Sequence, residues 1–351
     1  MKKNIYEIVF SVLLGGFTVF ILLDTFVISS VYQTNTTAMN TSLFEETARP
    51  EITTEEPVET VSPTAVTPIR PAGDNSSRRS RSHNPGNRTN SELSEPTESP
   101  LQEIGTEIEI AASRGSWQDE NITIDITEYT YKDSAVYAAD IQLSSAQYLK
   151  TAFADDKFGK NITAATSAIA AANDGILAIN GDFYGAQERG YVIRNGIIYR
   201  DIPSDADVLC IYADGSMEII DPAEVSAQEL AERGAWQTFS FGPALIENGI
   251  ITAGIDEEVG RAMASNPRTA IGIIDDLHFV FIVSDGRTEE SEGLSLYELA
   301  QFMEQLGVTT GYNLDGGGSS TMVFEGNVIN IPTTNGRIFR ERGVSDIVYI
   351  G

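Results

Sequence analysis

The chain has 351 residues and is strongly acidic, with 51 Asp and Glu against 23 Lys and Arg and a net charge of −28. This charge argues against nucleic acid as a partner, because nucleic-acid-binding domains present a basic surface. A single cysteine, Cys210, excludes an intramolecular disulfide. Only His83 and His278 are histidines, which argues against a Ser-His-Asp triad or a multi-histidine metal site.

Residues 1–32 have the pattern of a transmembrane signal anchor. Two lysines precede an uncharged run from Val9 to Leu23, and extending that run across Asp24 reaches the roughly 20 apolar residues of a membrane span. A cleaved signal peptide is the alternative, although a small-residue cleavage site is hard to find. We expect residues 5–31 to hold the protein in the cell membrane as a single pass, with the bulk of the chain extracellular.

Residues 33–104 are rich in Thr, Pro, Ser and Glu and have few large apolar side chains. Such a composition cannot bury a core, so it predicts a disordered stalk. The globular part then covers residues 105–351, which is about the upper size for one hydrophobic core. Apparent export without disulfides is typical of a bacterial surface protein.

In chain order, the first clear element of the globular part is a strand. Apolar and polar residues alternate from Ile122 to Tyr131, the period of a half-buried strand, and residues 135–143 resemble its partner. An Ala-rich helix is expected at residues 163–172. Hairpin turns between apolar runs are predicted at Asn195-Gly196, Asp214-Gly215 and Asn248-Gly249.

The C-terminal part contains one helix that is marked at both ends. Ser295 and Glu298 form a capping box, and Gly307 is a stop signal. A strand is expected from Thr309 to Leu314. Since strands outnumber helices and alternate with them irregularly, the pattern predicts an α+β domain with a large mixed β-sheet and a few packed helices.

A glycine-rich stretch follows that strand. It contains Asn313, Leu314, Asp315, Gly316, Gly317, Gly318, Ser319 and Ser320. Three consecutive glycines weaken a strand, so sheet building does not explain them. They allow backbone N–H groups to approach an anion or a sugar oxygen, with the aspartate at the mouth and the serine hydroxyls along the loop. A glycine-rich turn capped by the aspartate is the alternative interpretation.

Three further polar clusters interrupt apolar strands. Charged and amide groups at the ends of buried strands are costly unless they converge on one another or on a ligand. Each cluster alone is also a turn signal, but together with the glycine loop they predict a site for a sugar that carries an anion. The clusters are Asn180-Gly181-Asp182-Phe183-Tyr184, Pro267-Arg268-Thr269 and Ser284-Asp285-Gly286-Arg287.

In sequence and order these four motifs resemble the phosphodiester glycosidase family. The resemblance covers roughly residues 170–351 and includes the segment from Arg342 to Asp346. It implies a hydrolase that cleaves a sugar from a glycosyl-1-phosphodiester. Two departures leave the substrate open, because the disulfides of the animal enzyme cannot form here and the apolar segment lies at the opposite end.

The chemistry of this reaction assigns roles to the motif residues. The leaving group is a phosphate monoester, so neutralising its charge and placing a carboxylate at the oxocarbenium-like centre matter more than a strong general acid. Arg268 is the expected phosphate clamp, because a guanidinium grips phosphate through two N–H groups. The catalytic candidates are Asp315, Asp182 and Asp285. The substrate-binding candidates are Asn180, Tyr184, Thr269, Asn313, Gly316, Gly317, Gly318, Ser319 and Ser320.

Other readings of the same residues stay open. No cofactor is expected, although carboxylate clusters also bind Ca²⁺, so a structural ion is an alternative. The runner-up function is a non-catalytic surface module that binds anionic wall glycan through the same loop. The polar clusters argue against a third option, a structural spacer. The sequence does not name the sugar, the aglycone or the stereochemical outcome.

Overall fold

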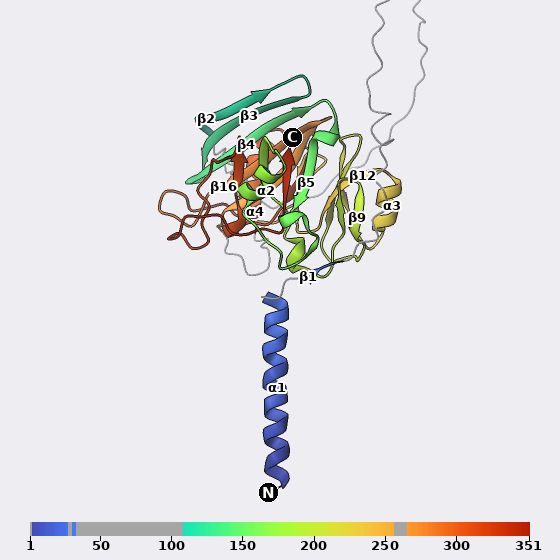
Figure 1. Ribbon diagram of the computed structural model, residues 1–351. Helices are drawn as coiled ribbons and strands as arrows, with labels where there is room; N and C mark the ends of the chain where they lie inside the picture. The colour runs from blue at the N-terminus through green and yellow to red at the C-terminus, as the bar shows by residue number, and fades with distance from the viewer. Residues whose placement is uncertain (1, 27–29, 33–107, 256–264) are drawn as a thin grey trace, which may run out of the picture. The chain divides into compact units, whose positions relative to one another are not determined.

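The computed structural model describes residues 2–26, 30–32, 108–255 and 265–351 (Figure 1). The chain divides into two units, one made of residues 1–48 with 106–351 and the other of residues 49–105. All described residues belong to the first unit. The stalk predicted for residues 33–104 lies outside the described residues.

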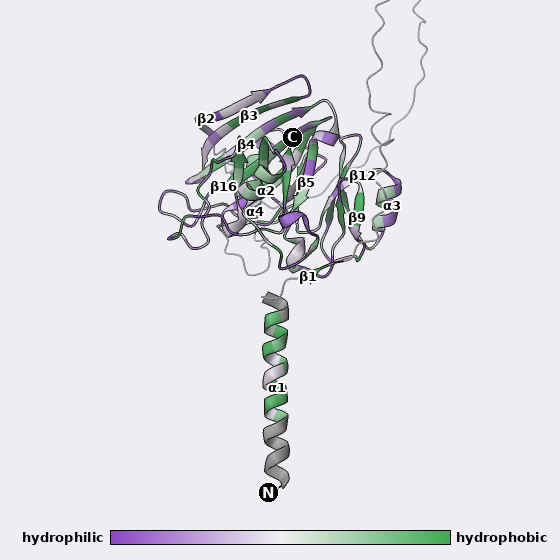
Figure 2. Ribbon diagram, in the orientation of Figure 1, coloured by the Kyte–Doolittle hydropathy of each residue, from purple (hydrophilic) through white to green (hydrophobic). Residues whose placement is uncertain are grey.

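The N-terminal segment begins with the helix α1 (Lys2–Phe26), whose described residues are coloured mostly hydrophobic in Figure 2. Within the part of the chain that the structure describes, no helix is long and apolar enough to cross a membrane. The transmembrane anchor predicted for residues 1–32 is therefore not confirmed. After α1, β1 (Ser30–Val31) pairs with β6 (Gly159–Lys160).

The larger sheet has eight strands, and each neighbouring pair is antiparallel. Along one face, Phe279 and Phe281 point into the main core, while the alternating Val280 and Ile282 face the other side. In spatial order the strands are β14 (Ile250–Ile251), β13 (Ala244–Glu247), β17 (Thr310–Asn313), β15 (Arg268–Asp275), β16 (His278–Ser284), β4 (Ser134–Leu143), β3 (Ile122–Tyr131) and β2 (Glu109–Gln118).

A second antiparallel sheet of five strands packs on that core face. Its Ile179 and Val348 join Phe281 and Ile141 of the larger sheet in one buried cluster. In spatial order its strands are β19 (Asn327–Val328), β18 (Met322–Phe324), β7 (Leu177–Asn180), β20 (Asp346–Ile350) and β5 (Leu149–Phe153).

One helix covers the outer face of each sheet. Leu299 and Phe302 of α4 (Leu296–Gln305) pack against Val280 and Ile282 of the larger sheet. Ile169 of α2 (Thr166–Ala172) packs in the same way against the smaller sheet. The core therefore has four layers in the order helix, sheet, sheet, helix, which leaves the strand ends free to carry polar groups.

Smaller elements connect these layers. A three-stranded sheet and a hairpin pack with α3 (Ala227–Glu232) around a separate buried cluster. Their strands are β10 (Val208–Tyr212), β11 (Met217–Ile220), β12 (Ala235–Phe239), β8 (Val192–Arg194) and β9 (Ile197–Arg200). Short 3₁₀ turns occupy η2 (Ala146–Tyr148), η3 (Ala154–Asp156), η4 (Tyr184–Ala186) and η5 (Gly317–Ser319).

The strand-rich α+β class is confirmed, but the single mixed sheet is not. Every strand pair among the described residues is antiparallel, and the core uses two large sheets. The strand Ile122–Tyr131 has the predicted bounds. The three predicted turns join β8 to β9, β10 to β11 and β13 to β14, and the capping box of Ser295 and Glu298 is present at α4.

Candidate active site

Strand pairing brings three of the four polar motifs together. Arg268, at the start of β15, pairs with Ser284 at the end of β16. On the other side of β15, Ala270 pairs with Asn313 at the end of β17. The antiparallel register thus places these motifs together at one edge of the larger sheet, the edge formed by the ends of its central strands. Their positions at strand ends predict this arrangement.

Asn180 connects the fourth motif, at the end of β7 in the smaller sheet, to this edge. Its Nδ2 donates to the carbonyl of Asp315 (2.6 Å), and its Oδ1 accepts from the hydroxyl of Thr269 (2.8 Å). Both Asn180 and Thr269 are fully buried. The two residues therefore join the sheets beneath the glycine loop instead of facing a ligand.

The glycine loop uses several of its amides internally. The N–H of Gly317 donates to the carbonyl of Pro267 (2.8 Å), and the N–H groups of Ser319 and Ser320 donate back to Gly316 and Gly317 (3.2 Å each). Gly317 has φ +62°, a conformation that favours glycine. A Cβ at Gly317 would lie 2.9 Å from Nη2 of Arg287, so the bare backbone makes room for that arginine.

A small cavity opens beside the loop, and we call it the arginine pocket. Its volume is about 160 Å³. Three guanidinium groups, from three separate segments, line it together with one carboxylate. The lining residues are Phe241, Asn266, Arg268, Arg287, Asn313, Leu314, Asp315, Gly316, Gly317 and Arg342.

Protein acceptors hold two of these arginines in place. Nε of Arg268 donates to the carbonyl of Leu294 (2.8 Å), and its side chain is buried. Arg287 donates through Nη2 to Oδ1 of Asn266 (2.7 Å) and through Nη1 to the carbonyl of Thr334 (2.5 Å). Burial lowers the pKa of Arg287, and the nearby charge of Arg342 lowers it further. An anion bound in the pocket would relieve that repulsion.

Asp315 is the one carboxylate among the described residues that line the pocket. Its Oδ2 accepts from the hydroxyl of Ser319 (2.6 Å) and from Nη2 of Arg342 (2.8 Å). Burial raises the pKa of Asp315, while Arg342 and the hydrogen bond from Ser319 oppose that rise. Arg342 therefore favours the ionised carboxylate.

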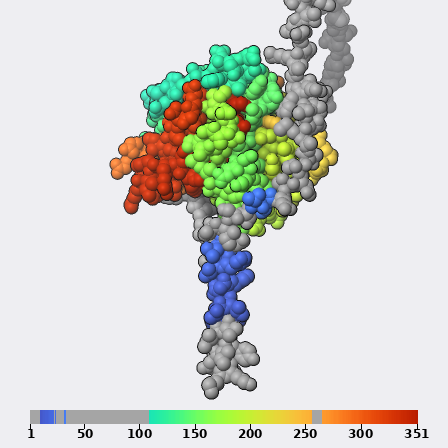
Figure 3. All heavy atoms as spheres, in the orientation of Figure 1, coloured from blue at the N-terminus to red at the C-terminus, as the bar shows by residue number. Residues whose placement is uncertain are grey.

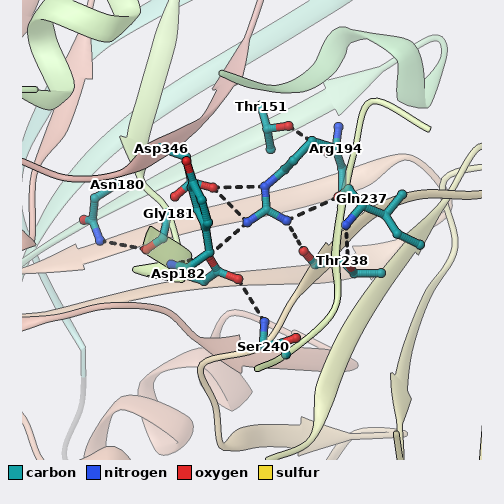
Figure 4. Close-up of polar contacts among 12 residues, drawn as sticks. Thr151, Asn180, Gly181, Asp182, Arg194, Gln237, Thr238, Ser240 and Asp346 are labelled. Carbon is teal, nitrogen blue, oxygen red and sulfur yellow. Dashed lines mark hydrogen bonds and ion pairs between the residues drawn. The ribbon is translucent and has the colours of Figure 1, made fainter. Parts of the chain in front are cut away.

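Asp182 does not line the arginine pocket. Figure 4 shows it with Asp346 around the guanidinium of Arg194, whose Nη2 lies 2.9 Å from Oδ1 of Asp182 and 2.8 Å from Oδ2 of Asp346. All three side chains are buried, and the other oxygen of Asp182 accepts from the N–H of Ser240 (2.9 Å). Burial raises the pKa of Asp346 to about 7, although Arg194 lowers it. We call these three residues the buried triad.

The triad lies directly behind the glycine loop. The N–H of Gly181 donates to the carbonyl of Asp346 (2.9 Å), and the carbonyl of Gly181 accepts from the N–H of Asp315 (3.3 Å). A Cβ on Gly181 would collide with the carboxylate of Asp346. The triad therefore fixes the segment against which Asp315 is held.

The structure places the remaining candidates as follows. Oδ1 of Asp285 accepts from Nδ2 of Asn330 (3.0 Å) and from the N–H of Ile331 (2.9 Å), and Asp285 lines a different cavity. Tyr184 is buried and stacks on Phe158, with ring centroids 5.1 Å apart. Ser320 is also fully buried. None of these three candidate side chains lines the arginine pocket.

Two arginines of the pocket carry no role in the sequence analysis. Arg287 is the last residue of the motif that begins at Ser284, and Arg342 is the first residue of the last segment in the family resemblance. Both therefore stand in recognised motifs, although the motifs alone did not assign them a function. Asn266 and Phe241 had none, because neither stands in a motif. Across the described ranges, no three His, Cys, Asp or Glu side chains are grouped closely enough to hold a metal ion.

Comparisons with known proteins assign the chain to a class. The family model for phosphodiester glycosidases matches residues 173–351, about half the chain. The chain therefore belongs to the phosphodiester glycosidase family, and the resemblance drawn from its motifs is confirmed.

Particular relatives are similar over shorter stretches. The SPbeta prophage-derived uncharacterized protein YomE of Bacillus subtilis is 31% identical over 155 residues, 43% of this chain and 23% of that protein. The mouse N-acetylglucosamine-1-phosphodiester alpha-N-acetylglucosaminidase is 31% identical over 120 residues, 33% of this chain and 23% of the enzyme. The chain thus spans about a quarter of the length of these relatives.

Among solved structures, the catalytic domain of the zebrafish N-acetylglucosamine-1-phosphodiester alpha-N-acetylglucosaminidase, auto-inhibited by its pro-peptide, has a similar fold. The TM-score is 0.53 with 19% identity, over 70% of this chain and 87% of that one. A hypothetical protein from Synechocystis follows, with a TM-score of 0.51 and 16% identity, over 66% of this chain and 62% of that one. At these identities the likeness concerns the fold.

Proposed function

We propose that this protein hydrolyses a glycosyl-1-phosphodiester and releases the free sugar. The observation that carries the proposal is the arginine pocket, where three guanidinium groups and the carboxylate of Asp315 line one small cavity. Its volume of about 160 Å³ lies below the roughly 300–1,000 Å³ of pockets that enclose whole drug-sized ligands. We infer that it takes the phosphate group, with the sugar and the aglycone extending outward.

In this proposal the bond between sugar C1 and the phosphate oxygen breaks. The electron pair leaves with the phosphate, and Arg268, Arg287 and Arg342 stabilise the developing negative charge. Asp315 faces the positive charge that develops at C1, either as a nucleophile or as a base that takes a proton from the attacking water. Water supplies the hydroxyl group at C1, so the products are a free sugar and a phosphate monoester.

The other predicted carboxylates take structural roles in this proposal. Asp182 neutralises Arg194 in the buried triad, and Asp285 holds the chain at Asn330 and Ile331. Arg342 instead takes part in the reaction together with Asp315, because its guanidinium contacts that carboxylate directly.

The substrate and its location rest on the sequence. We propose an anionic cell-surface or exopolysaccharide glycan outside the cell, supported by the acidic composition and by the order of two lysines, an apolar run and a Thr/Pro-rich segment. Protease treatment of intact cells tests this location. Digestion of the domain is expected, and full protection until lysis would contradict it.

Incubation with a panel of sugar-1-phosphate methyl diesters tests the activity itself. The wild type is expected to release reducing sugar from at least one diester, and Asp315→Asn is expected to release it roughly 10³-fold more slowly. Asp140→Asn is the matched control, because Asp140 on β4 is exposed, pairs with His278 (2.9 Å) and does not line the arginine pocket. Binding of the diesters without any release would instead favour a non-catalytic glycan-binding module.

A further inference from the structure

A second cavity, which we call the aromatic cavity, shares no lining residue with the arginine pocket. Its volume of about 450 Å³ falls within the roughly 300–1,000 Å³ typical of small-molecule sites. Three aromatic side chains line it, with the rings of Tyr32 and Tyr199 centred 5.2 and 5.3 Å from that of Phe158. In Figure 3 residues 30–32 are the small group of blue atoms that lies against the domain.

Arg200 supplies a buried positive charge to this cavity. The side chain is 8% exposed, and it donates to the carbonyls of Gly190 (2.7 Å), Tyr184 (3.1 Å) and Gln187 (2.5 Å). Its Nη2 has no hydrogen-bond partner among the described residues. A buried N–H group without an acceptor is costly, particularly on a charged side chain, and burial lowers the pKa of Arg200. An anion in the cavity would neutralise this buried guanidinium charge.

The local charge differs from that of the chain as a whole. Lys160 lines the cavity beside Arg200, although the protein carries a net charge of −28. The carboxylate at the cavity is Glu188, whose side chain is 79% exposed and 3.5 Å from Nζ of Lys160. Two cations and three aromatic rings thus line one cavity of a strongly acidic protein. This combination suits a ligand that carries both a negative charge and an apolar ring face.

The two cavities lie on either side of one loop. The guanidinium of Arg342, in the arginine pocket, lies 5.9 Å from the ring of Phe183. The next residue, Tyr184, stacks on Phe158 of the aromatic cavity. The segment Phe183–Tyr184 therefore contacts residues of both cavities.

We propose that the aromatic cavity binds a sugar unit that carries a carboxylate or a phosphate. The aromatic rings would pack against the apolar face of the pyranose, and Arg200 would receive the anion. This binding site goes beyond the proposed hydrolysis and does not require it.

The test measures binding of D-glucuronate, glucose 6-phosphate and glucose to the full-length protein by isothermal titration calorimetry. None of these probes contains a glycosyl-1-phosphodiester, so the result is independent of turnover. Ile202 is 47% exposed and lines the cavity, and a substitution leaves the hydrogen bond of its backbone carbonyl with Gly190 in place, so its variants should fold. We expect Ile202→Glu to weaken binding of the anionic sugar at least about tenfold through like-charge repulsion, while Ile202→Lys retains or strengthens it.

Arg233→Gln is the matched control, since Arg233 is exposed at the end of α3 and does not line the cavity. Its affinity for the anionic sugar should equal that of the wild type. Binding of glucuronate alone would identify carboxylate sugars, and binding of glucose 6-phosphate alone would identify phosphate sugars. The proposal fails if neither acid binds more tightly than glucose, or if binding is insensitive to both Ile202 variants.

Discussion

The molecule pairs arginine with aspartate in two polar clusters that differ in access to solvent. In the buried triad, the side chains of Arg194, Asp182 and Asp346 are 2%, 1% and 0% exposed. In the arginine pocket, those of Arg342 and Asp315 are 39% and 10% exposed. The same kind of ion pair is thus sealed in one place and open to a ligand in the other.

The difference indicates what each pair does. Protein groups surround the guanidinium of Arg194 on several sides. It donates to the carbonyl of Thr238, and its Cζ lies 4.7 Å from the ring centroid of Phe239. Losing one partner of such a pair leaves an uncompensated buried charge. Arg342 borders a cavity instead, so in the proposed function the substrate phosphate takes over part of its contact to Asp315. We therefore assign the triad to the fold and, within the proposed function, the pocket to the chemistry.

The largest effect on activity is expected for Asp315→Asn. Loss of the carboxylate should lower kcat by roughly 10³-fold, within the range for removal of a catalytic acid or base, while the melting temperature changes little. In Asp182→Asn the order should reverse, with stability falling first because Arg194 loses a charged partner. Steady-state kinetics and thermal melts of both variants check this, and equal kcat losses without a stability difference would refute the division of roles.

Arg194→Met should give the largest loss of stability. Two buried carboxylates would then lack their cation, so the free energy of unfolding is expected to drop by about 3–5 kcal/mol. Arg233→Met is the control, because its pair with Glu229 is exposed and such pairs contribute little to stability. Urea denaturation of both variants measures the contrast, and similar small losses would show that the triad is not a structural centre.

Gly317→Ala separates backbone strain from the displacement of Arg287. The new methyl group enters a left-handed conformation and lies close to Nη2 of Arg287, so the melting temperature and kcat/KM should both fall. Gly326→Ala shares the strain, with φ +76°, but nothing lies within 4 Å of its Cβ. That control should lose comparable stability, about 1 kcal/mol, and retain activity. If Gly317→Ala keeps full activity, the bare backbone at Gly317 is not needed to place Arg287 for the reaction.

Arg268→Lys should lower kcat/KM at least ~10-fold, the scale of one charged hydrogen bond. A lysine keeps the charge but cannot both donate to Leu294 and present a planar fork to phosphate. Arg340→Lys, in an exposed position on the loop before Arg342, is the comparison. If the kinetics of Arg268→Lys are close to those of the wild type, Arg268 does not bind the phosphate and the phosphate site lies elsewhere.

The smallest effect is a change in pH dependence for Arg342→Gln. Arg342 lowers the pKa of Asp315 against the effect of burial, so its removal should let that pKa rise. The carboxylate then ionises only at higher pH, and the acid limb of kcat/KM should move to higher pH. Arg287→Gln is expected to move the limb less, since Arg287 donates to Asn266 and to the carbonyl of Thr334 and makes no hydrogen bond to Asp315 among the described residues. If the acid limb of kcat/KM does not move in Arg342→Gln, that limb does not report the ionisation of Asp315.

The local parts of the fold and the meeting of the motifs were predictable from sequence. Asn-Gly and Asp-Gly turns specify their hairpins, and the capping box marks the start of α4, because these signals depend on neighbouring residues alone. Polar motifs at the ends of apolar strands also indicated that Arg268 and Asp315 would approach each other.

The direction of each side chain was not predictable, because it depends on distant partners. Asp182 stands only two residues after Asn180, yet Arg194 of the next hairpin and Asp346 near the C-terminus turn it into the core. Arg342 reaches Asp315 across 27 residues of chain, and no periodicity or turn signal encodes that contact. Long-range charge pairing therefore decided which aspartate faces the pocket.

Hydrolysis in ¹⁸O-labelled water tests the central claim most directly, because it reports which bond breaks. A sugar-1-phosphate diester that the protein turns over is hydrolysed to completion, and the phosphate monoester is examined by ³¹P NMR for the isotope shift of incorporated ¹⁸O. If Asp315 acts at sugar C1 and the arginines hold the leaving phosphate, the phosphate product carries no label. Label in the phosphate would show attack at phosphorus and would contradict the assignment of a glycosidase.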